Sequence, residues 1–346
     1  MNIDLLQELT EAHGVSGRED AIREIVRREL GPLGELSSDS MGNVICVKRG
    51  SGGGKKVMIA AHMDEIGFCV KFIDDKGFVR LQTLGGWDPR QMNAQRVIVG
   101  TKDGPLRGVL MYSSKPAHLL TEGEKKGQNH DEFFVDLGLS GEEAKAKVRI
   151  GDPVTMDRGF FQLGNLLTCK TMDDRVGVFV MIEAIKALGA HEVDVYAVAT
   201  VQEEVGLRGA AAAGWSVQPD IAIALDITLA NDIPGLPEQD QITRLGQGAA
   251  IKVMDSSLIC HPKVVDHFRD VAEAKGIKYQ LEVLSRGGTD AGAIQRLHGG
   301  IPSFTLSIPT RYVHTVNETV HGEDVQACID LLACYLEDAH SREYGY

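Results

Sequence analysis

The chain of 346 residues is 43% hydrophobic and 25% charged, which is typical of a globular protein that buries a full core and forms more than one domain. Its net charge of -13 argues against a nucleic-acid partner, because binding to a phosphate backbone needs a basic face. No apolar stretch reaches the roughly 18 residues that span a bilayer, and the first residues do not resemble a signal peptide. We therefore expect a cytoplasmic protein without a membrane partner.

The chain opens with two predicted helices. Residues 3–12 carry apolar side chains at helical spacing, and Gly14 follows as a stop signal. The sequence Ser16-Gly17-Arg18-Glu19 matches a capping box, which predicts a second helix that continues through Leu30. Strands are then expected near Leu36, over residues 43–47 and over residues 57–61, where the continuous apolar run is typical of a strand that is buried on both faces.

From about residue 68 to residue 162 the pattern changes to short alternating runs between Gly, Pro and Asp turns. Only one short helix is expected there, near residues 141–147, and the polar stretch 116–131 predicts a mobile loop. Long strands and helices resume after residue 163. This order predicts an α/β domain formed by residues 1–68 and 163–346, with a small β domain of residues 69–162 inserted in it.

Potential metal ligands follow four apolar strands at the points where these strands end. They are His62, the pair Glu203-Glu204, Asp226 and His314. Because ligands bind beyond the carboxyl ends of the strands in open α/β sheets, these side chains can converge. The pair Asp173-Asp174 at the start of a helix adds carboxylates, although its simpler role would be to complement the helix dipole.

The types of ligand discriminate among metals. Two imidazoles and at least three carboxylates, without a thiolate, favour a pair of Zn, Co or Mn ions over a structural zinc site or a calcium site. Neighbouring residues of an extended chain cannot both point at one ion. One of Glu203 and Glu204 would therefore be a ligand, and the other a general base for a water shared by the two ions. Asp64, two residues after His62, suits a partner that orients the imidazole.

Six motifs, in chain order, resemble those of the TET, glutamyl and deblocking aminopeptidases, which are dinuclear metallopeptidases. The motifs are Ala61-His62-Met63-Asp64-Glu65, Asp173-Asp174-Arg175, Gln202-Glu203-Glu204-Val205-Gly206, Asp226-Ile227-Thr228, Gly287-Gly288-Thr289-Asp290-Ala291 and Pro309-Thr310-Arg311-Tyr312-Val313-His314. The resemblance covers nearly the whole chain and is weakest in the inserted domain. It implies a zinc-peptidase-like catalytic domain, with a mixed sheet and helices on both faces, and an inserted small β-barrel of the PDZ-like kind.

The resemblance also implies roles for the site residues. Asp173 would bridge both ions, Glu203 would be the general base, and Asp64 would support His62. The other ligands would be His62 and Asp226 for one ion, and Glu204 and His314 for the second. A cis peptide bond would join Asp173 to Asp174, which leaves Asp174 outside the ligand set, although two adjacent aspartates keep an assignment shifted by one residue open.

The predicted function is hydrolysis of N-terminal residues from short peptides, by a metal-bridging hydroxide with Glu203 as general base. The family also implies dimers that assemble into a tetrahedral dodecamer. Candidates for the specificity pocket are Leu284, Arg286, Thr289 and Arg311, although long basic side chains often lie on a solvated surface.

Three alternatives stay open at this point. A metal-dependent deacylase or dipeptidase would use a similar cluster, and the need for a free amino terminus distinguishes it. A glycosidase of the cellulase or endoglucanase kind also uses paired carboxylates, but a chelator would not abolish its activity. A non-catalytic metal- or peptide-binding module would leave the second glutamate of the Glu203-Glu204 pair without a task.

Overall fold

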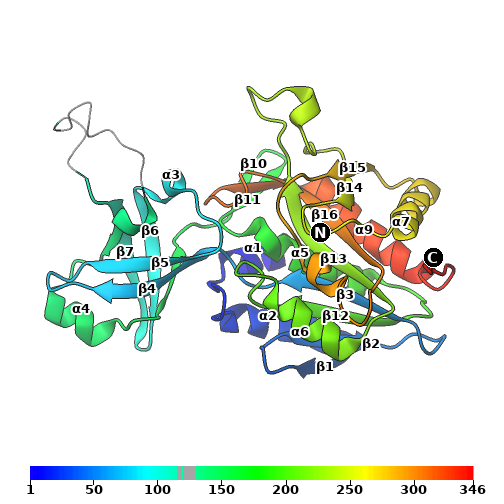
Figure 1. Ribbon diagram of the computed structural model, residues 1–346, viewed down its shortest axis with the longest axis horizontal. Helices are drawn as coiled ribbons and strands as arrows, with labels where there is room; N and C mark the ends of the chain where they lie inside the picture. The colour runs from blue at the N-terminus through cyan, green and yellow to red at the C-terminus, as the bar shows by residue number, and fades with distance from the viewer. Residues whose placement is uncertain (115–118, 120–128, 346) are drawn as a thin grey trace.

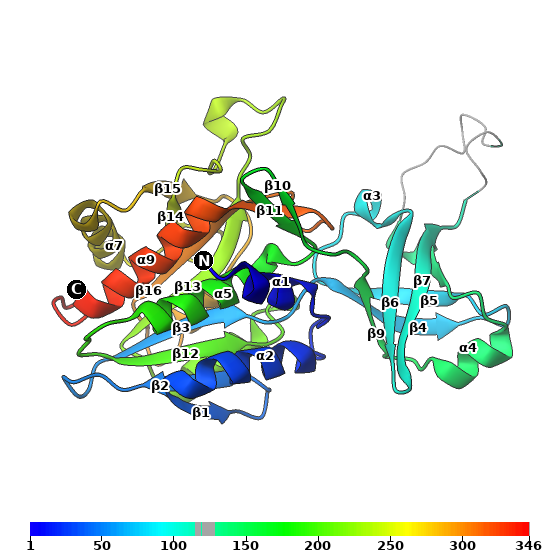
Figure 2. The same ribbon diagram turned by 180° about the vertical axis from the view of Figure 1, so that it is seen from behind.

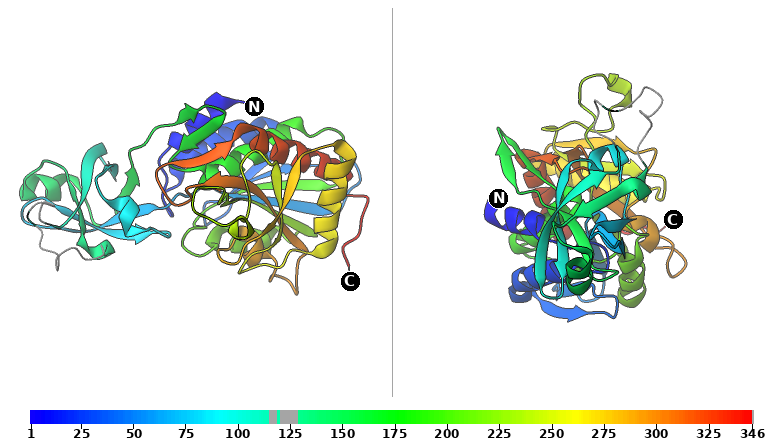
Figure 3. Two further views of the ribbon diagram at one scale, coloured as in Figure 1. Left: turned by 90° about the horizontal axis from the view of Figure 1, so that it is seen from above. Right: turned by 90° about the vertical axis from the view of Figure 1, so that its left-hand side faces the viewer.

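Figure 1 shows the computed structural model, which describes residues 1–114, 119 and 129–345. The described residues form an 11-stranded mixed sheet covered by helices and a separate closed β-barrel. Seen from above, the barrel projects from one end of the sheet domain (Figure 3). The predicted fold class is therefore confirmed. Most of the stretch 116–131, which was predicted to be a mobile loop, lies outside the described residues.

The order of strands in the sheet brings four parallel strands side by side. Along the sheet the strands are β1 (Glu35–Ser38), β2 (Val44–Lys48), β12 (Asp194–Thr200), β3 (Lys56–His62), β13 (Ile221–Leu229), β16 (Ser303–Arg311), β17 (Glu318–His321), β11 (Leu166–Cys169) and β10 (Phe161–Leu163). Two further strands branch from β16, namely β14 (Ala249–Met254) and then β15 (Tyr279–Val283). Because β12, β3, β13 and β16 are parallel, their carboxyl ends meet at one edge of the sheet.

Helices cover both faces of the sheet. One face packs against α1 (Ile3–Glu11), α2 (Asp20–Leu30), α5 (Met172–Ala187), α7 (Pro262–Lys275) and α9 (Gly322–Asp338), most of which lie in front in Figure 2. The other face packs against α6 (Arg208–Val217) and α8 (Asp290–Ile294). Within β3, Ile59 faces the first layer and Met58 the second, which explains why this strand is apolar at every position from Val57 to Ala61. Within the described part of the chain, no helix is long and apolar enough to cross a membrane.

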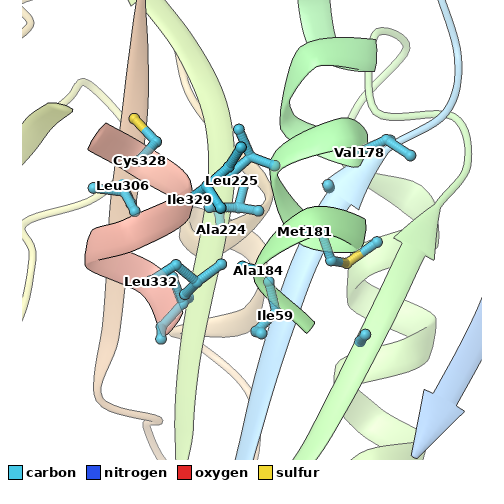
Figure 4. Packing of buried hydrophobic residues seen from close by; sticks show 14 of the residues in the cluster. Ile59, Val178, Met181, Ala184, Ala224, Leu225, Leu306, Cys328, Ile329 and Leu332 are labelled. Carbon is cyan, nitrogen blue, oxygen red and sulfur yellow. The ribbon is translucent and has the colours of Figure 1, made fainter. Parts of the chain in front are cut away.

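The largest core lies between the sheet and helices α5 and α9 (Figure 4). Met181 of α5 and Leu332 of α9 are completely buried in this core, which also contains the sheet residues Ile59 and Leu225. Burial of such a side chain contributes about 1.5 to 3 kcal/mol. This core fixes the strands whose ends carry the predicted ligands.

The barrel has its own apolar core, in which Phe68 stacks on Trp87 with ring centroids 5.0 Å apart. Its strands, in order around the barrel, are β4 (Gly67–Ile73), β5 (Val79–Leu84), β8 (Phe133–Asp136), β7 (Gly104–Tyr112), β6 (Gln95–Thr101) and β9 (Pro153–Met156). Two short helices flank them, α3 (Pro89–Met92) and α4 (Gly141–Lys147). The division into residues 1–68, 69–162 and 163–346 remains a proposal. Strand β10 already belongs to the sheet, although its first two residues fall within the proposed insert.

The predicted capping box at Ser16 and Glu19 is wrong, because both side chains bind elsewhere. Helix α2 begins at Asp20, and no side chain caps its first turn. The Ser16 hydroxyl instead donates to Asp64 Oδ2 at 2.6 Å. Glu19 Oε1 accepts hydrogen bonds from the N–H groups of Gly17 and Gln202. These bonds hold the loop between α1 and α2 against the edge of the sheet where the predicted ligands lie.

Candidate metal centre

The predicted ligands meet in one cavity at the carboxyl edge of the parallel strands. His62 is the last residue of β3, Asp226 lies in β13, and the other ligands lie in the segments that follow β12 and β16 or at the start of α5. The cavity has a volume of about 570 Å³, and its wall includes His62, Asp173, Glu203, Glu204, Asp226 and His314. The topology therefore brings together residues that are up to 252 positions apart, from His62 to His314.

Asp173 faces both imidazoles, whereas Asp174 does not. Asp173 Oδ1 lies 3.1 Å from His62 Nε2, and Asp173 Oδ2 lies 3.4 Å from His314 Nε2. The peptide bond between Asp173 and Asp174 is cis, as the family resemblance implies. The carboxylate of Asp174 accepts hydrogen bonds from the N–H groups of His62 and Gly177, at 3.2 and 3.1 Å. Since both oxygens of Asp174 are bonded to the backbone, Asp173 is the carboxylate that remains available to a metal.

Two groups of side chains have ligand atoms within 4.8 Å of one another. The first contains His62, Asp173 and Glu204, and the second contains His62, Glu203 and Asp226. His314 joins the first group, because its Nε2 lies 3.6 Å from Glu204 Oε1. Glu203 Oε2 lies 3.9 Å from His62 Nε2, so the geometry allows Glu203 to be a ligand as well as a base. Both groups consist of imidazoles and carboxylates only.

The buried carboxylates repel one another, as their pKa values indicate. Burial, together with the charge of Asp173, raises the pKa of Glu204 to about 8 and that of Asp226 well above its ordinary value. Burial and the charge of Asp226 likewise raise the pKa of Glu203. The buried atom Glu204 Oε1 has no hydrogen-bond partner in the described part of the chain. An excess of buried anionic oxygens with an unpartnered acceptor fits divalent cations, which would neutralise it.

The pKa values of the two imidazoles are raised as well, although by a different cause. Burial by itself would lower the pKa of His314, but the hydrogen bond to Asp173 and the charge of Glu204 raise it to about 10. Burial also opposes protonation of His62, yet the charge of Glu203 and the hydrogen bond to Asp173 raise its pKa well above the ordinary value. Metal binding requires neutral imidazoles, so bound cations would have to displace these protons.

Asp64 holds the two sides of the site together. Its backbone carbonyl lies 3.0 Å from His62 Nδ1, which leaves Nε2 facing the cavity. Its carboxylate is 3.5 Å from the same nitrogen and accepts the N–H groups of Glu203 and Glu204, at 2.9 and 3.2 Å. Asp64 is thus a positioning residue, which orients His62 and both glutamates.

Two supporting residues were missed by the sequence analysis. Buried Glu318 accepts the N–H groups of Asp173, at 2.9 Å, and of His314, at 2.8 Å, so it links two predicted ligands. Gly86, in the segment that joins β5 to α3, accepts a hydrogen bond from His314 Nδ1 at 2.8 Å. A Cβ atom at Gly86 would lie 3.1 Å from that nitrogen, so the close approach favours glycine. The only signal in the sequence was a carboxylate four residues after His314.

The specificity candidates divide into two kinds. Leu284, Arg286 and Thr289 line the cavity. The guanidinium of Arg311 instead forms a double hydrogen bond with Asp232, at 2.6 and 2.7 Å, and Arg311 is absent from the cavity wall. Arg311 therefore does not meet a substrate in this cavity.

Comparison with known proteins identifies relatives along the whole chain. A family model described as M42 glutamyl aminopeptidase matches residues 42–331, and one described as AMPT matches residues 2–25. A lysyl aminopeptidase of Pyrococcus furiosus is 36% identical over 352 residues, which cover 99% of this chain and 98% of the relative. The solved structure of an aminopeptidase from Desulfurococcus kamchatkensis has a TM-score of 0.93 and 43% identity, covering 97% of this chain and 94% of its own. A TET peptidase of Pyrococcus horikoshii has a TM-score of 0.86 and 32% identity, with 96% and 98% covered, and it assembles into a tetrahedron or an octahedral shell.

Proposed function

Because the chain belongs to the M42 glutamyl aminopeptidase family and is an aminopeptidase, we propose that it removes N-terminal residues from short peptides with two divalent metal ions. The observation that carries the proposal is the position of Asp173, whose two oxygens face the imidazoles of His62 and His314. A carboxylate in this position suits a bridge between two ions. The nitrogen and oxygen donors favour Zn, Co or Mn.

The proposed ligand set has two halves around Asp173. His62 and Asp226 would complete one half, and Glu204 and His314 the other. Bound divalent ions of this kind acidify a water molecule and polarise the carbonyl group of the bond that is cleaved. The protein itself supplies the orientation of the ligands, through the hydrogen bonds of Asp64 and Glu318.

Glu203 would act as the general base. It lines the cavity, and its N–H group is fixed by Asp64 Oδ1 at 2.9 Å, so the backbone holds the carboxylate near the proposed ions. Glu203 would accept a proton from the attacking water and donate it to the amine of the departing peptide. This role requires Glu203 to be ionised before the attack and protonated after it.

We also propose that the chain self-associates, as dimers that build a tetrahedral dodecamer. The proposal is supported by the assembly of the Pyrococcus horikoshii relative and by the barrel, which carries none of the six proposed ligands and bases. Light scattering on the intact protein tests it, since a monomer of 37.5 kDa at working concentration would contradict assembly.

The decisive experiment removes the metal and then restores it. Protein stripped with a chelator is refilled with Zn, Co or Mn and given a tetrapeptide, the same peptide acetylated at its amino terminus, and a soluble cellulose derivative. We expect release of the first residue from the free peptide only, and only after metal is added. Cleavage of the acetylated peptide would favour the deacylase, and metal-independent cleavage of the polysaccharide would favour the glycosidase.

A further inference from the structure

A buried cluster of charged side chains adjoins the metal centre, although none of its members is a proposed ligand or base. The cluster consists of Glu65, Lys170 and Arg175, which are 2%, 4% and 0% exposed. Glu65 pairs with Lys170, and Glu65 Oε1 lies 3.6 Å from a guanidinium nitrogen of Arg175. None of the three lines the cavity. Burial of charges costs free energy that pairing need not recover, so the cluster points to a role other than stability.

Arg175 ties the end of helix α1 to the chain that follows β3. Its Nε donates to the carbonyl oxygen of Met63, the residue after His62, at 2.6 Å. Its other two nitrogens donate to carbonyl oxygens at or just after the end of α1, namely those of Leu9 at 2.8 Å, Ala12 at 3.1 Å and Gly14 at 3.2 Å. A Cβ atom at Gly14 would lie 3.2 Å from the guanidinium, so this close approach favours glycine. The backbone after α1 is therefore held at a fixed position relative to His62.

The other two charged side chains hold the same segment. Glu65 Oε1 accepts the N–H group of Gly14 at 2.8 Å, and the N–H group of Glu65 donates to the carbonyl oxygen of Gly14 at 3.0 Å. Lys170 Nζ lies 3.4 Å from the carbonyl oxygen of Ala12. Ser16 comes two residues after Gly14, so the cluster restricts where the hydroxyl of Ser16 lies.

We propose that Ser16 is a positioning residue of the metal centre, which acts on the proposed ligands through Asp64. The Ser16 hydroxyl donates to Asp64 Oδ2 at 2.6 Å, and the same oxygen accepts the N–H group of Glu204 at 3.2 Å. Asp64 Oδ1 accepts the N–H group of Glu203 and lies 3.5 Å from His62 Nδ1. The hydroxyl therefore fixes the rotation of a carboxylate that faces His62 and both glutamates.

Loss of the hydroxyl would remove one donor from the Asp64 carboxylate and free it to rotate. The N–H groups of Glu203 and Glu204 and the ring of His62 would then lose a fixed partner, and the ligand atoms would no longer be held in place for the ions. Residues that orient metal ligands typically contribute about 10-fold to 100-fold in metal affinity or activity. The inference rests on the proposed function, since it assumes that divalent ions bind at these residues.

Ser16→Ala and Ser16→Thr test the hydroxyl directly. Ser16 is half-buried in the loop between α1 and α2, so the loss of one oxygen leaves the core intact. Zinc affinity of the stripped protein is measured by competition with a chromogenic chelator, and kcat and KM are measured at saturating zinc. We expect Ser16→Ala to bind the weaker of its zinc ions about tenfold less tightly and to lower kcat by a similar factor, with KM little changed. Ser16→Thr keeps the hydroxyl and should restore both values.

Two comparisons separate this role from a structural one. Arg18→Gln is the matched control in the same loop, because the Arg18 side chain is exposed and makes no hydrogen bond or ion pair within residues 1–114, 119 and 129–345. This variant should keep the zinc affinity of the wild type. In a double-mutant cycle, the losses of zinc affinity caused by Ser16→Ala and Asp64→Asn should be less than additive, because the two residues share one hydrogen bond.

Unaltered zinc affinity in Ser16→Ala, or a loss that adds fully to that of Asp64→Asn, would overturn the inference. Zinc binding is measured without a substrate, so this outcome differs from failure of the proposed function. If the zinc-loaded wild type releases no amino acid from any peptide, the proposed function is wrong, whereas the zinc affinities still decide the role of Ser16.

Discussion

Replacement of Glu203 by Gln tests the mechanism most directly, because the change removes one proton-accepting oxygen and leaves the shape of the side chain. The backbone position of residue 203 depends on the hydrogen bond from its N–H group to Asp64 Oδ1, at 2.9 Å. The side chain does not contribute to that bond. The Glu203 side chain is also 11% exposed, so the amide does not have to pack into a closed core. We therefore expect the Glu203→Gln protein to fold and to keep its cavity.

The expected magnitude follows from the role of a general base. A positioned base contributes about 100-fold to 10,000-fold, which corresponds to roughly 2.7 to 5.5 kcal/mol of activation free energy. Glu203 Oε2 lies 3.9 Å from His62 Nε2, which is longer than the 3.1 Å between Asp173 Oδ1 and the same nitrogen. Glu203 is thus further than Asp173 from this proposed ligand nitrogen. We expect kcat to fall by about 100-fold or more while both ions stay bound.

The assay measures kcat on a chromogenic aminoacyl substrate together with metal content per chain. Glu204→Gln is the matched control, because the same chemical change at the neighbouring residue should weaken one metal site. Loss of metal from Glu203→Gln, with both ions retained in Glu204→Gln, would show that the two roles are reversed. Full activity of Glu203→Gln would refute the general-base assignment.

Three other predictions concern the metal, the core and His267 of α7. His314→Ala should lower metal content toward one ion per chain, as elemental analysis would show, because it deletes a nitrogen near Asp173 and Glu204. Leu332→Ala should lower the free energy of unfolding by about 2 to 5 kcal/mol in urea titrations, since Leu332 is fully buried, whereas exposed Asp330→Ala should change it little. Burial lowers the pKa of His267 below 6.5 despite its hydrogen bond to Asp338, so the unfolded chain binds the proton more tightly. The contribution of His267 to stability should therefore be present above pH 6.5 and decrease as the pH falls below it, and His267→Gln should flatten that part of the profile.

The sequence alone determined the elements that depend on local patterns. The apolar run of β3 predicted a strand buried on both faces, and the structure places helices on both sides of it. Polar residues at or near the ends of the predicted parallel strands indicated that His62, Glu203, Asp226 and His314 would meet, because the carboxyl ends of such strands share one edge. Both inferences need only the periodicity of a short segment and a general rule of topology.

Tertiary structure decided every question that depends on which distant residues lie side by side. The sequence around Ser16 matches a helix cap, but the Ser16 hydroxyl donates a hydrogen bond to Asp64, which is 48 positions away. Asp173 and Asp174 are equivalent in the sequence, and only the backbone N–H groups of His62 and Gly177 show that Asp174 is already occupied. Arg286 and Arg311 were equal candidates for the specificity pocket in the sequence. Only the fold shows that Arg311 pairs with Asp232. Which partners lie within reach of a side chain is set by the folded chain and not by the neighbouring residues in the sequence.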